Sequence, residues 1–390
     1  MDVRTKYLAR YTEPRVLSYT TDQVYRAALV VPAYDEPMAA LRNLAQHAHK
    51  ANALLIVIVN TPSNAPKDAR ARTIAMLNQL EEADLANVLA LNYAEEGLPR
   101  QKGVGLARKI GCDTALSLQA KGQIESPWIY TTDADAYLPD NYFSYDLDAH
   151  GAAGNHNGAR VFAHRHKIND AKLQQAVDTY DLHMAYYVAG LTFAGSRYAH
   201  PTLGSTIAIH GETYAQVRGF PKKNAAEDFY LLNKVAKIAP VTFVPEVELI
   251  LEGRLSERVP FGTGPALAKI TALDSPFESY NFAAFEALHT TLSALTHFGE
   301  HGILALSSPE SMILDQLGWS EREQHFADRY APKQRQKAVH DWFDALKTLQ
   351  FMHKAAEFYP DENLLETMRA LPKSVLGTID RHMQRDRLHK

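Results

Sequence analysis

The chain has 390 residues, of which 46% are apolar and 22% charged, a globular composition that excludes long disordered tracts. Lys and Arg number 41 against 45 Asp and Glu, and this net charge of −4 excludes an overall basic field for nucleic acid, although not a local basic cleft. The one cysteine, Cys112, excludes an internal disulfide framework and is typical of a reducing compartment. With no apolar core of a signal peptide in residues 1–25 and no apolar run long enough for a membrane helix, we expect a cytoplasmic protein without an integral membrane segment.

The first half of the chain alternates between short apolar runs and segments with apolar residues three or four apart. The expected strands cover residues 27–31, 54–59, 88–91 and 128–132. The expected helices lie around residues 41–48, 74–80 and 104–118. This alternation predicts an α/β fold with a mostly parallel sheet and helices on both faces. Ligands of such sheets bind beyond the carboxyl ends of the strands.

After Asp135 the pattern changes, and from about residue 270 it indicates helices almost throughout. The expected elements are a long helix at 173–191, strands at 205–210 and 247–251, a helix at 227–239, and an amphipathic stripe at 342–356. We therefore divide the chain into an N-terminal arm (1–26), an α/β domain (27–269) and a helical C-terminal extension (270–390). The extension offers a surface for a homodimer.

Asp133 and Asp135 follow the fourth expected strand directly. Two carboxylates at positions i and i+2 point the same way where the backbone is extended. Their hard oxygens suit Mg²⁺ or Mn²⁺, and such an ion in turn binds a diphosphate. The alternative is an ordinary turn, because Asp favours turns.

A second acidic pair, Glu227 and Asp228, begins an expected helix. Carboxylates at that position are stabilised by the free N–H groups and by the helix dipole, which is a purely structural explanation. The functional explanation makes one of them a general base that deprotonates an acceptor hydroxyl.

Two glycine-containing segments carry cations. The segment 97–105 enters a helix with Lys102, and Arg108 follows, which suits phosphate binding although the glycine spacing matches neither a Walker A loop nor a dinucleotide fingerprint. The segment 254–264 contains Arg258 and could close over a diphosphate as a lid. Solvated helix charges and an ordinary loop are the structural alternatives.

Taken together, these motifs resemble those of the glycosyltransferase family 2-like enzymes of the GT-A fold, over roughly residues 26–265. Residues 31–36 (VPAYDE) are similar to the family's opening V-P-A-Y-N-E signature, and 106–111 (LARKIG) to its A-R-N-x-G helix. The D-x-D element ends at Asp135. The strongest similarity runs from 204–210 (GSTIAIH) through 217–220 (VRGF) to Glu227-Asp228.

This resemblance implies a metal-dependent transfer of a sugar from a nucleotide diphosphate to a hydroxyl acceptor, a hexosyltransferase activity, with inversion and with Asp228 as the base. It implies that Asp133 and Asp135 hold Mg²⁺ or Mn²⁺ and the donor. The resemblance also implies which further residues bind the donor and which bind the acceptor. The donor site would also comprise Pro32, Tyr34, Glu36, Asn60, Lys102, Arg108 and Arg258, and the acceptor site Gly204, Ser205 and Glu227.

The sequence departs from the family where the second strand usually ends in Asp-Asp-Gly-Ser, since residues 60–63 read Asn-Thr-Pro-Ser. The donor base therefore stays open. The segments at Lys102 and Arg258 also resemble those of retaining GT-A enzymes that act on a small phosphorylated acceptor, in which a histidine completes the metal shell; His210 is the candidate here.

Two other functions compete. A sugar-phosphate nucleotidyltransferase would carry a glycine-rich, basic signature after the first strand, where this chain has Pro-Ala-Tyr-Asp-Glu-Pro. A non-catalytic sugar-nucleotide-binding or interaction protein would explain the altered run at Asn60. His164 and His166 alternate as on one face of a strand, and we expect them to be structural.

Overall fold

The computed structural model describes residues 2–148, 157–253 and 263–384 and divides into two compact units. The first unit comprises Met1–Gln174 and Thr202–Ala266, and the second comprises Gln175–Pro201 and Leu267–Lys390. Helices α5 (Ala171–Phe193) and α8 (Thr263–Thr271) each begin in the first unit and end in the second. Among the helices of the described ranges, none has both the length and the apolar character that a bilayer crossing needs.

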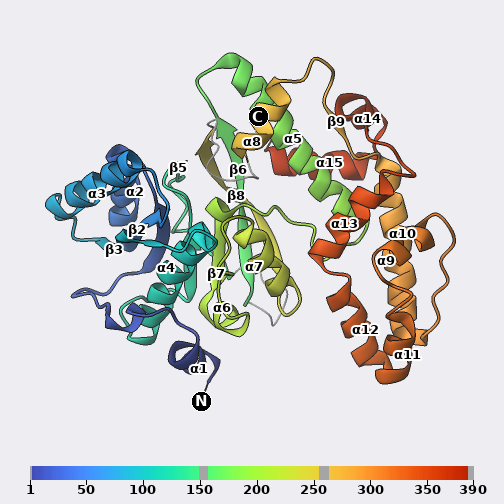
Figure 1. Cartoon of the computed structure of the whole chain (residues 1–390), viewed down its shortest axis with the longest axis horizontal. Coiled ribbons are helices and arrows are strands. Elements are labelled where there is room, and N and C mark those ends of the chain that lie inside the picture. The colour runs from blue at the N-terminus through green and yellow to red at the C-terminus, as the bar shows by residue number, and fades with distance from the viewer. Residues whose placement is uncertain (1, 149–156, 254–262, 385–390) are drawn as a thin grey trace. The chain divides into compact units, whose positions relative to one another are not determined.

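The first unit is built on an eight-stranded mixed sheet with the strand order β3-β2-β1-β4-β7-β6-β8-β5 (Figure 1). Neighbours β3–β2, β2–β1, β1–β4 and β6–β8 are parallel, whereas β7 is antiparallel to β4 and β6, and β5 to β8. The strands are β1 (Ala27–Ala33), β2 (Ala53–Pro62), β3 (Val88–Leu98), β4 (Trp128–Thr131), β5 (Ala136–Tyr137), β6 (Ala159–Lys167), β7 (Ile207–His210) and β8 (Val241–Glu252).

Helices cover both faces of this sheet, as the apolar patterns predicted. On one face, α2 and α3 pack on side chains such as Leu29 and Leu55. On the other, the helices α1, α4, α6 and α7 pack on side chains such as Val30 and Ile56. Their bounds are α1 (Val3–Arg10), α2 (Met38–Lys50), α3 (Lys67–Glu82), α4 (Gly103–Ala120), α6 (Gly211–Gln216) and α7 (Glu227–Ala236), with short 3₁₀ turns η1 (Val16–Ser18) and η2 (Gly204–Thr206).

Strand β1 continues one residue beyond Pro32, although the sequence predicted that the strand ends before it. Pro32 pairs in register with Ile58 of β2, while the neighbour on the other side, β4, pairs only as far as Val30. A proline lacks the N–H group that a second neighbour would need. Pro32 is therefore tolerated because the strand beside it has already ended.

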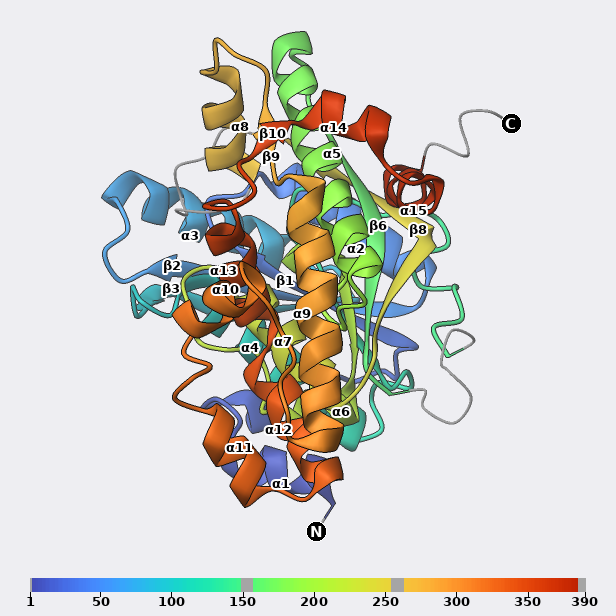
Figure 2. The same cartoon turned by 90° about the vertical axis from the view of Figure 1, so that its right-hand side faces the viewer.

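The second unit is mainly helical and has its own aromatic core. Helices α10, α12 and α13 pack against the long helix α9, as Figure 2 shows. The core includes Tyr186, Phe285, Phe298, Trp319 and Phe351. The elements are α9 (Phe282–His301), α10 (Glu310–Gln316), α11 (Glu323–Arg329), α12 (Pro332–Trp342), α13 (Ala345–Ala355), α14 (Leu364–Ala370) and α15 (Lys373–Met383), with a two-stranded ribbon of β9 (Glu278–Ser279) and β10 (Glu362–Asn363).

Two sequence predictions for this unit were wrong in detail. The extension is not all-helical, because β9 and β10 pair as an antiparallel ribbon. The amphipathic stripe at 342–356 is not one helix either, since α12 ends at Trp342 and α13 begins at Ala345. Asp344 causes this break: its carboxylate accepts hydrogen bonds from the N–H groups of Leu346 and Lys347 and so caps the second helix.

Candidate functional site

The candidate site lies where the order of the parallel strands reverses. The chain proceeds from β1 outward through β2 to β3 and then returns to place β4 on the other side of β1. Such a reversal opens a crevice beyond the carboxyl ends of the two central strands. Residues Tyr34 and Glu36 follow β1 at this edge, and Asp133 and Asp135 follow β4, so the fold brings two of the predicted motifs to one edge of the sheet.

The D-x-D element is a turn and not an extended strand end. Strand β4 ends at Thr131, and the backbone turns at Ala134 and Asp135 before β5 begins. The condition for both carboxylates to point the same way, an extended backbone, is therefore not met here. Both Asp133 and Asp135 are half-buried, and the Asp135 carbonyl accepts a hydrogen bond from the N–H of Glu252 (3.2 Å).

Arg108 is the buried centre of the site. Its side chain is 3% exposed, and its guanidinium pairs with Asp133 (2.5 Å) and with Glu227 (2.9 Å). It also donates to the hydroxyl of Thr131 (2.7 Å) and the carbonyl of Thr132 (3.4 Å). Burial lowers the pKa of Arg108, but Asp133, Glu227 and Asp228 together raise it by more, so the guanidinium stays charged.

Asp228 lies beside this ion pair at the start of α7. Its carboxylate accepts hydrogen bonds from the N–H groups of Phe229 (2.7 Å) and Gly204. Burial and the neighbouring Glu227 nevertheless raise the pKa of Asp228 to about 7. A carboxylate whose pKa is close to neutral is able to take up a proton and release it again under physiological conditions.

The turn η2 brings the predicted acceptor residues into contact with this cluster. The Ser205 hydroxyl donates to Asp133, and the Ser205 carbonyl accepts from the hydroxyl of Thr132 (2.8 Å). Gly204 lies against the guanidinium of Arg108, and a Cβ there would come within 2.6 Å of it. The predicted acceptor residues therefore contact this cluster, namely Gly204, Ser205 and Glu227. Position 204 requires a glycine because the guanidinium of Arg108 lies so close to its backbone.

The VPAYDE motif follows β1 at the same edge of the sheet. Asp35 adopts a left-handed conformation (φ 55°), which Asn and Asp tolerate better than other non-glycine residues. Its carboxylate accepts two hydrogen bonds from Arg72 of α3, at 2.7 and 2.8 Å. Pro32, Tyr34 and Glu36 are half-buried beside it. The Asp in place of the usual Asn is therefore compatible with the turn.

Asn60 lies near the carboxyl end of β2, in register with Tyr93 of β3. It is 7% exposed, and within the described part of the chain its side-chain oxygen Oδ1 has no hydrogen-bond partner. A buried polar atom without a partner costs free energy unless a ligand or water satisfies it. Asn60 therefore offers an acceptor atom at the edge where the sequence predicted donor binding.

The glycines around Lys102 have a packing role that the sequence did not reveal. The N–H of Gly105 donates to the carbonyl of Lys223 (3.0 Å), and a Cβ at Gly105 would come within 2.5 Å of that oxygen. A Cβ at Gly103 would likewise meet Asn224. The segment 221–224 thus covers the first turn of α4, where the sequence favoured a phosphate. Lys102 itself is exposed at the N-cap of α4.

One predicted residue, His210, lies away from this arrangement. His210 pairs in register with Trp128 at the start of β4, whereas Ile207 pairs with Thr131 at its end. About 10 Å of strand therefore separates His210 from the turn at Asp133, and its ring caps α6 by accepting from the N–H of Glu212 (3.3 Å). Arg258 and the rest of 254–262 lie outside the described residues.

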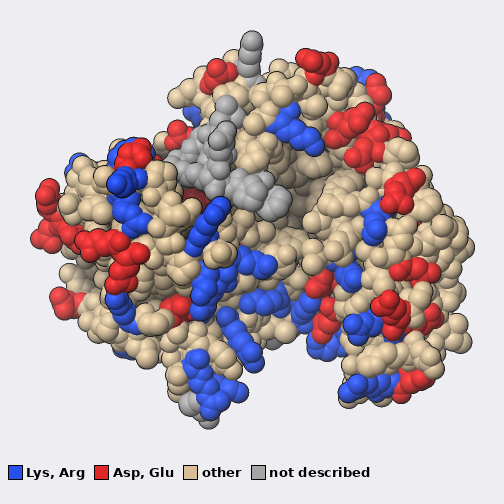
Figure 3. Space-filling model, viewed as in Figure 1, with Lys and Arg blue, Asp and Glu red and all other residues tan. Residues whose placement is uncertain are grey.

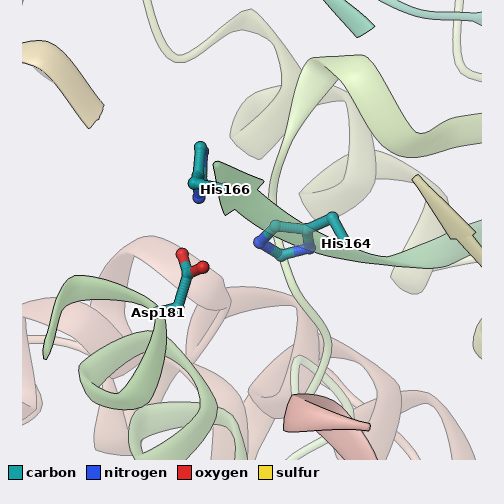
Figure 4. Close-up of side chains that lie close together, drawn as sticks. All are labelled: His164, His166 and Asp181. Atoms are coloured by element: carbon teal, nitrogen blue, oxygen red, sulfur yellow. The ribbon is translucent and has the colours of Figure 1, made fainter. Parts of the chain in front are cut away.

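His164 and His166 are on one face of β6, as their alternation predicted (Figure 4). Their ring centroids are 5.5 Å apart, and Nε2 of His166 is 3.0 Å from the hydroxyl of Thr263. Figure 4 also labels Asp181, which is on α5 and belongs to the second unit. The second unit carries a pocket of about 600 Å³, lined by residues 194–198 directly after α5, by one side of α9, and by His340 and Phe343.

A second buried cluster surrounds Lys109, the next residue along α4, and no sequence pattern predicted it. The Lys109 ammonium donates to the Tyr7 hydroxyl (2.5 Å), the Tyr11 carbonyl (2.9 Å) and Asp113 (2.9 Å). Asp113 also accepts from the hydroxyls of Tyr7 (2.6 Å) and Tyr214 (2.7 Å) and from the N–H of Glu13 (3.0 Å). This cluster fixes the N-terminal segment against α4.

Comparison with known proteins gave matches among solved structures but not among family models or curated proteins. No protein-family model matches the chain, and no curated protein matches it. Among solved structures, a mannosyltransferase from Pyrobaculum calidifontis, determined in complex with GDP-Man and Mn²⁺, is similar at 16% sequence identity and a TM-score of 0.38, over 90% of this chain and 94% of that one. A likeness of this size establishes no family, and the functional assignment rests on the geometry of the site.

Proposed function

We propose that the first unit is a glycosyltransferase domain of the GT-A type, which moves a sugar from a nucleotide diphosphate to a hydroxyl acceptor. The observation that carries this proposal is the cluster at the strand-order reversal. There, the buried Arg108 holds Asp133 and Glu227 in place, and Asp228 beside them has a pKa of about 7. The VPAYDE motif and Asn60 lie at the same edge and supply a pocket for the nucleotide.

The charges of the cluster favour a divalent cation. Three carboxyl groups (Asp133, Glu227 and Asp228) interact with one guanidinium, Arg108, so the formal charge of these four residues is −2, or −1 when Asp228 is protonated. Asp133 accepts two hydrogen bonds and retains further lone pairs for a metal. Hard carboxylate oxygens in excess fit Mg²⁺ or Mn²⁺, held by Asp133 and Asp135. When bound, the ion would neutralise the leaving diphosphate.

The residues of the chain have distinct roles in this mechanism. Asp228 accepts the proton of the acceptor hydroxyl while the hydroxyl oxygen forms its bond to the anomeric carbon and the nucleoside diphosphate leaves. Arg108 keeps Asp133 and Glu227 fixed, which preorganises the site before the donor arrives. Asn60 contributes its unpaired side-chain oxygen to the donor base. An in-line attack of this kind inverts the anomeric centre.

The test is product formation by the full chain. We expect that, with Mn²⁺ and one sugar nucleotide from a panel, a hydroxyl acceptor gains the mass of one hexose, that the anomeric configuration is inverted, and that EDTA stops the reaction. Retention of configuration would move the base role away from Asp228 and support the retaining alternative. Stoichiometric binding of a sugar nucleotide without turnover, over a broad acceptor screen, would support the non-catalytic alternative and overturn the proposal.

A further inference from the structure

The first unit carries a concentration of cations on the sheet face that α1, α4, α6 and α7 cover. Figure 3 shows Lys and Arg side chains gathered on this side of the molecule, over α1 and upward toward α4 and α7. We call this region the basic surface and define it by six exposed residues on three segments, namely Lys6, Arg10, Lys102, Arg218, Lys222 and Lys223. Its charge is opposite in sign to the net −4 of the whole chain.

Side-chain and backbone contacts join these three segments into one surface. The Arg218 guanidinium lies over the ring of Tyr11, 4.9 Å from its centroid. Lys222 pairs with Glu13 (2.5 Å), which is mostly buried. The carbonyl of Lys223 accepts from the N–H of Gly105 in the first turn of α4. The N-terminal segment, the loop before α7 and the start of α4 are therefore fixed side by side.

We propose that the basic surface binds the surface of an anionic lipid bilayer. Its cations come from three segments and are each exposed, which presents a broad positive face and not a closed pocket for one small anion. A cluster of four to eight Lys and Arg residues has the charge that negatively charged headgroups attract. A single-stranded nucleic acid would need free aromatic faces for base stacking. Here Arg218 covers Tyr11, and the Lys223 ammonium lies 4.1 Å from the ring centroid of Tyr230.

The consequence is that the domain works at a membrane surface. The loop that carries Lys222 and Lys223 leads directly into α7, which begins with Glu227 and Asp228. A bilayer bound to Lys222 and Lys223 would therefore bring headgroup hydroxyls or phosphates close to the candidate site, because only a few residues of chain separate these lysines from Glu227. Membrane binding does not itself depend on the proposed transferase activity, so the two proposals are tested separately.

The experiment is co-sedimentation of the full chain with phosphatidylcholine vesicles that contain or lack phosphatidylserine. We expect binding only to the anionic vesicles and a decrease as the salt concentration rises. The triple variant Arg10→Gln/Arg218→Gln/Lys223→Gln should bind about a hundredfold more weakly, or about fivefold for each charge removed. Asp228→Asn should bind vesicles as the wild type does.

The matched control removes three exposed cations from the opposite face of the sheet, Arg42→Gln/Lys50→Gln/Lys67→Gln. We expect it to bind like the wild type, and an equal loss in both triple variants would reduce the effect to net charge and overturn the proposal. Should the first triple variant fold poorly, the double variant Lys6→Gln/Arg10→Gln on the exposed side of α1 should bind about 25-fold more weakly. Equal binding to vesicles with and without phosphatidylserine would also overturn the proposal. So would displacement of the chain from anionic vesicles by glycerol phosphate or an oligonucleotide at low concentration.

Discussion

Consecutive residues of α4, Arg108 and Lys109, organise two buried charge clusters with opposite properties. The Lys109 ammonium and Asp113 carboxylate are surrounded by hydrogen-bond partners that satisfy them, and the Asp113 side chain is 0% exposed. The Arg108 cluster is instead unbalanced: within the described ranges, three carboxyl groups (Asp133, Glu227 and Asp228) interact with this one guanidinium, and Asp133 remains 39% exposed. The comparison teaches that a satisfied buried network holds a fold together, whereas an unbalanced one at a strand-order reversal is available for a ligand.

The largest expected effect is on turnover and concerns the Arg108 cluster. Asp228→Asn should lower the rate of sugar transfer by about 10²–10⁴-fold, because the amide cannot accept the acceptor proton. Binding of the donor should change little. Steady-state kinetics measure this loss, and Asp140→Asn, which changes an exposed residue of the same unit, is the control variant. Near-normal transfer by Asp228→Asn would remove the general base from this position.

The next effect is on stability and concerns the Lys109 cluster. Lys109→Met should lower the free energy of unfolding by about 3–5 kcal/mol, because it leaves Asp113 buried without its cation. Urea denaturation measures this loss. The double variant Lys109→Met/Asp113→Leu should regain much of it, since no unpaired charge remains. If the double variant were as unstable as the single one, loss of packing and not the buried charge would explain the result.

The rate of transfer should follow the protonation of Asp228. With a pKa of about 7, the carboxylate is mostly protonated at lower pH, so the turnover number should rise about tenfold per pH unit below pH 7 and level off above it. A pH–rate profile with saturating substrates measures this. A turnover number that does not change with pH between 5 and 7 would be incompatible with Asp228 as the base.

The smallest expected effect is on stability: neutralising a charged residue changes the free energy of unfolding in opposite directions in the two clusters. The pKa of Asp228 is raised in the folded chain, so the folded state holds the proton longer, and the free energy of unfolding should fall as the pH rises from about 4 to about 7. Asp228→Asn removes this penalty and should stabilise the chain by about 0.5–2 kcal/mol at pH 8, whereas neutralising Lys109 destabilises it. The difference in the free energy of unfolding between Asp228→Asn and the wild type should decrease toward zero at pH 4. Stabilisation that persisted at pH 4 would have another cause.

Local patterns predicted most of the fold. The runs at 27–31 and 54–59 became β1 and β2 because both faces of these strands are buried, so nearly every residue is apolar. The break at Phe343 was missed, since the apolar spacing continues across it and only the capping by Asp344 shows that a new helix begins. Helix α1 was missed because it has only 8 residues, of which Tyr7 alone is buried, so it has no apolar stripe.

The candidate site could be predicted only as separate motifs. The sequence placed Asp133 and Asp228 at ends of elements, but it gave no reason for Arg108 to bind Glu227, 119 residues away in the chain. Such a contact depends on the strand order, which no local pattern specifies. The glycines at 103 and 105 were assigned to phosphate for the same reason, because the segment that packs on them lies more than 100 residues later.

The most direct test of the central claim is calorimetric titration of the full chain with each nucleoside diphosphate, with and without Mn²⁺. The Arg108 cluster as a catalytic site predicts that one nucleotide binds, that it binds only with Mn²⁺, and that Asp135→Ala abolishes the effect of the metal while Lys109→Met, where still folded, retains it. Absence of binding across the set, or an affinity that neither Mn²⁺ nor Asp135→Ala changes, would contradict the account.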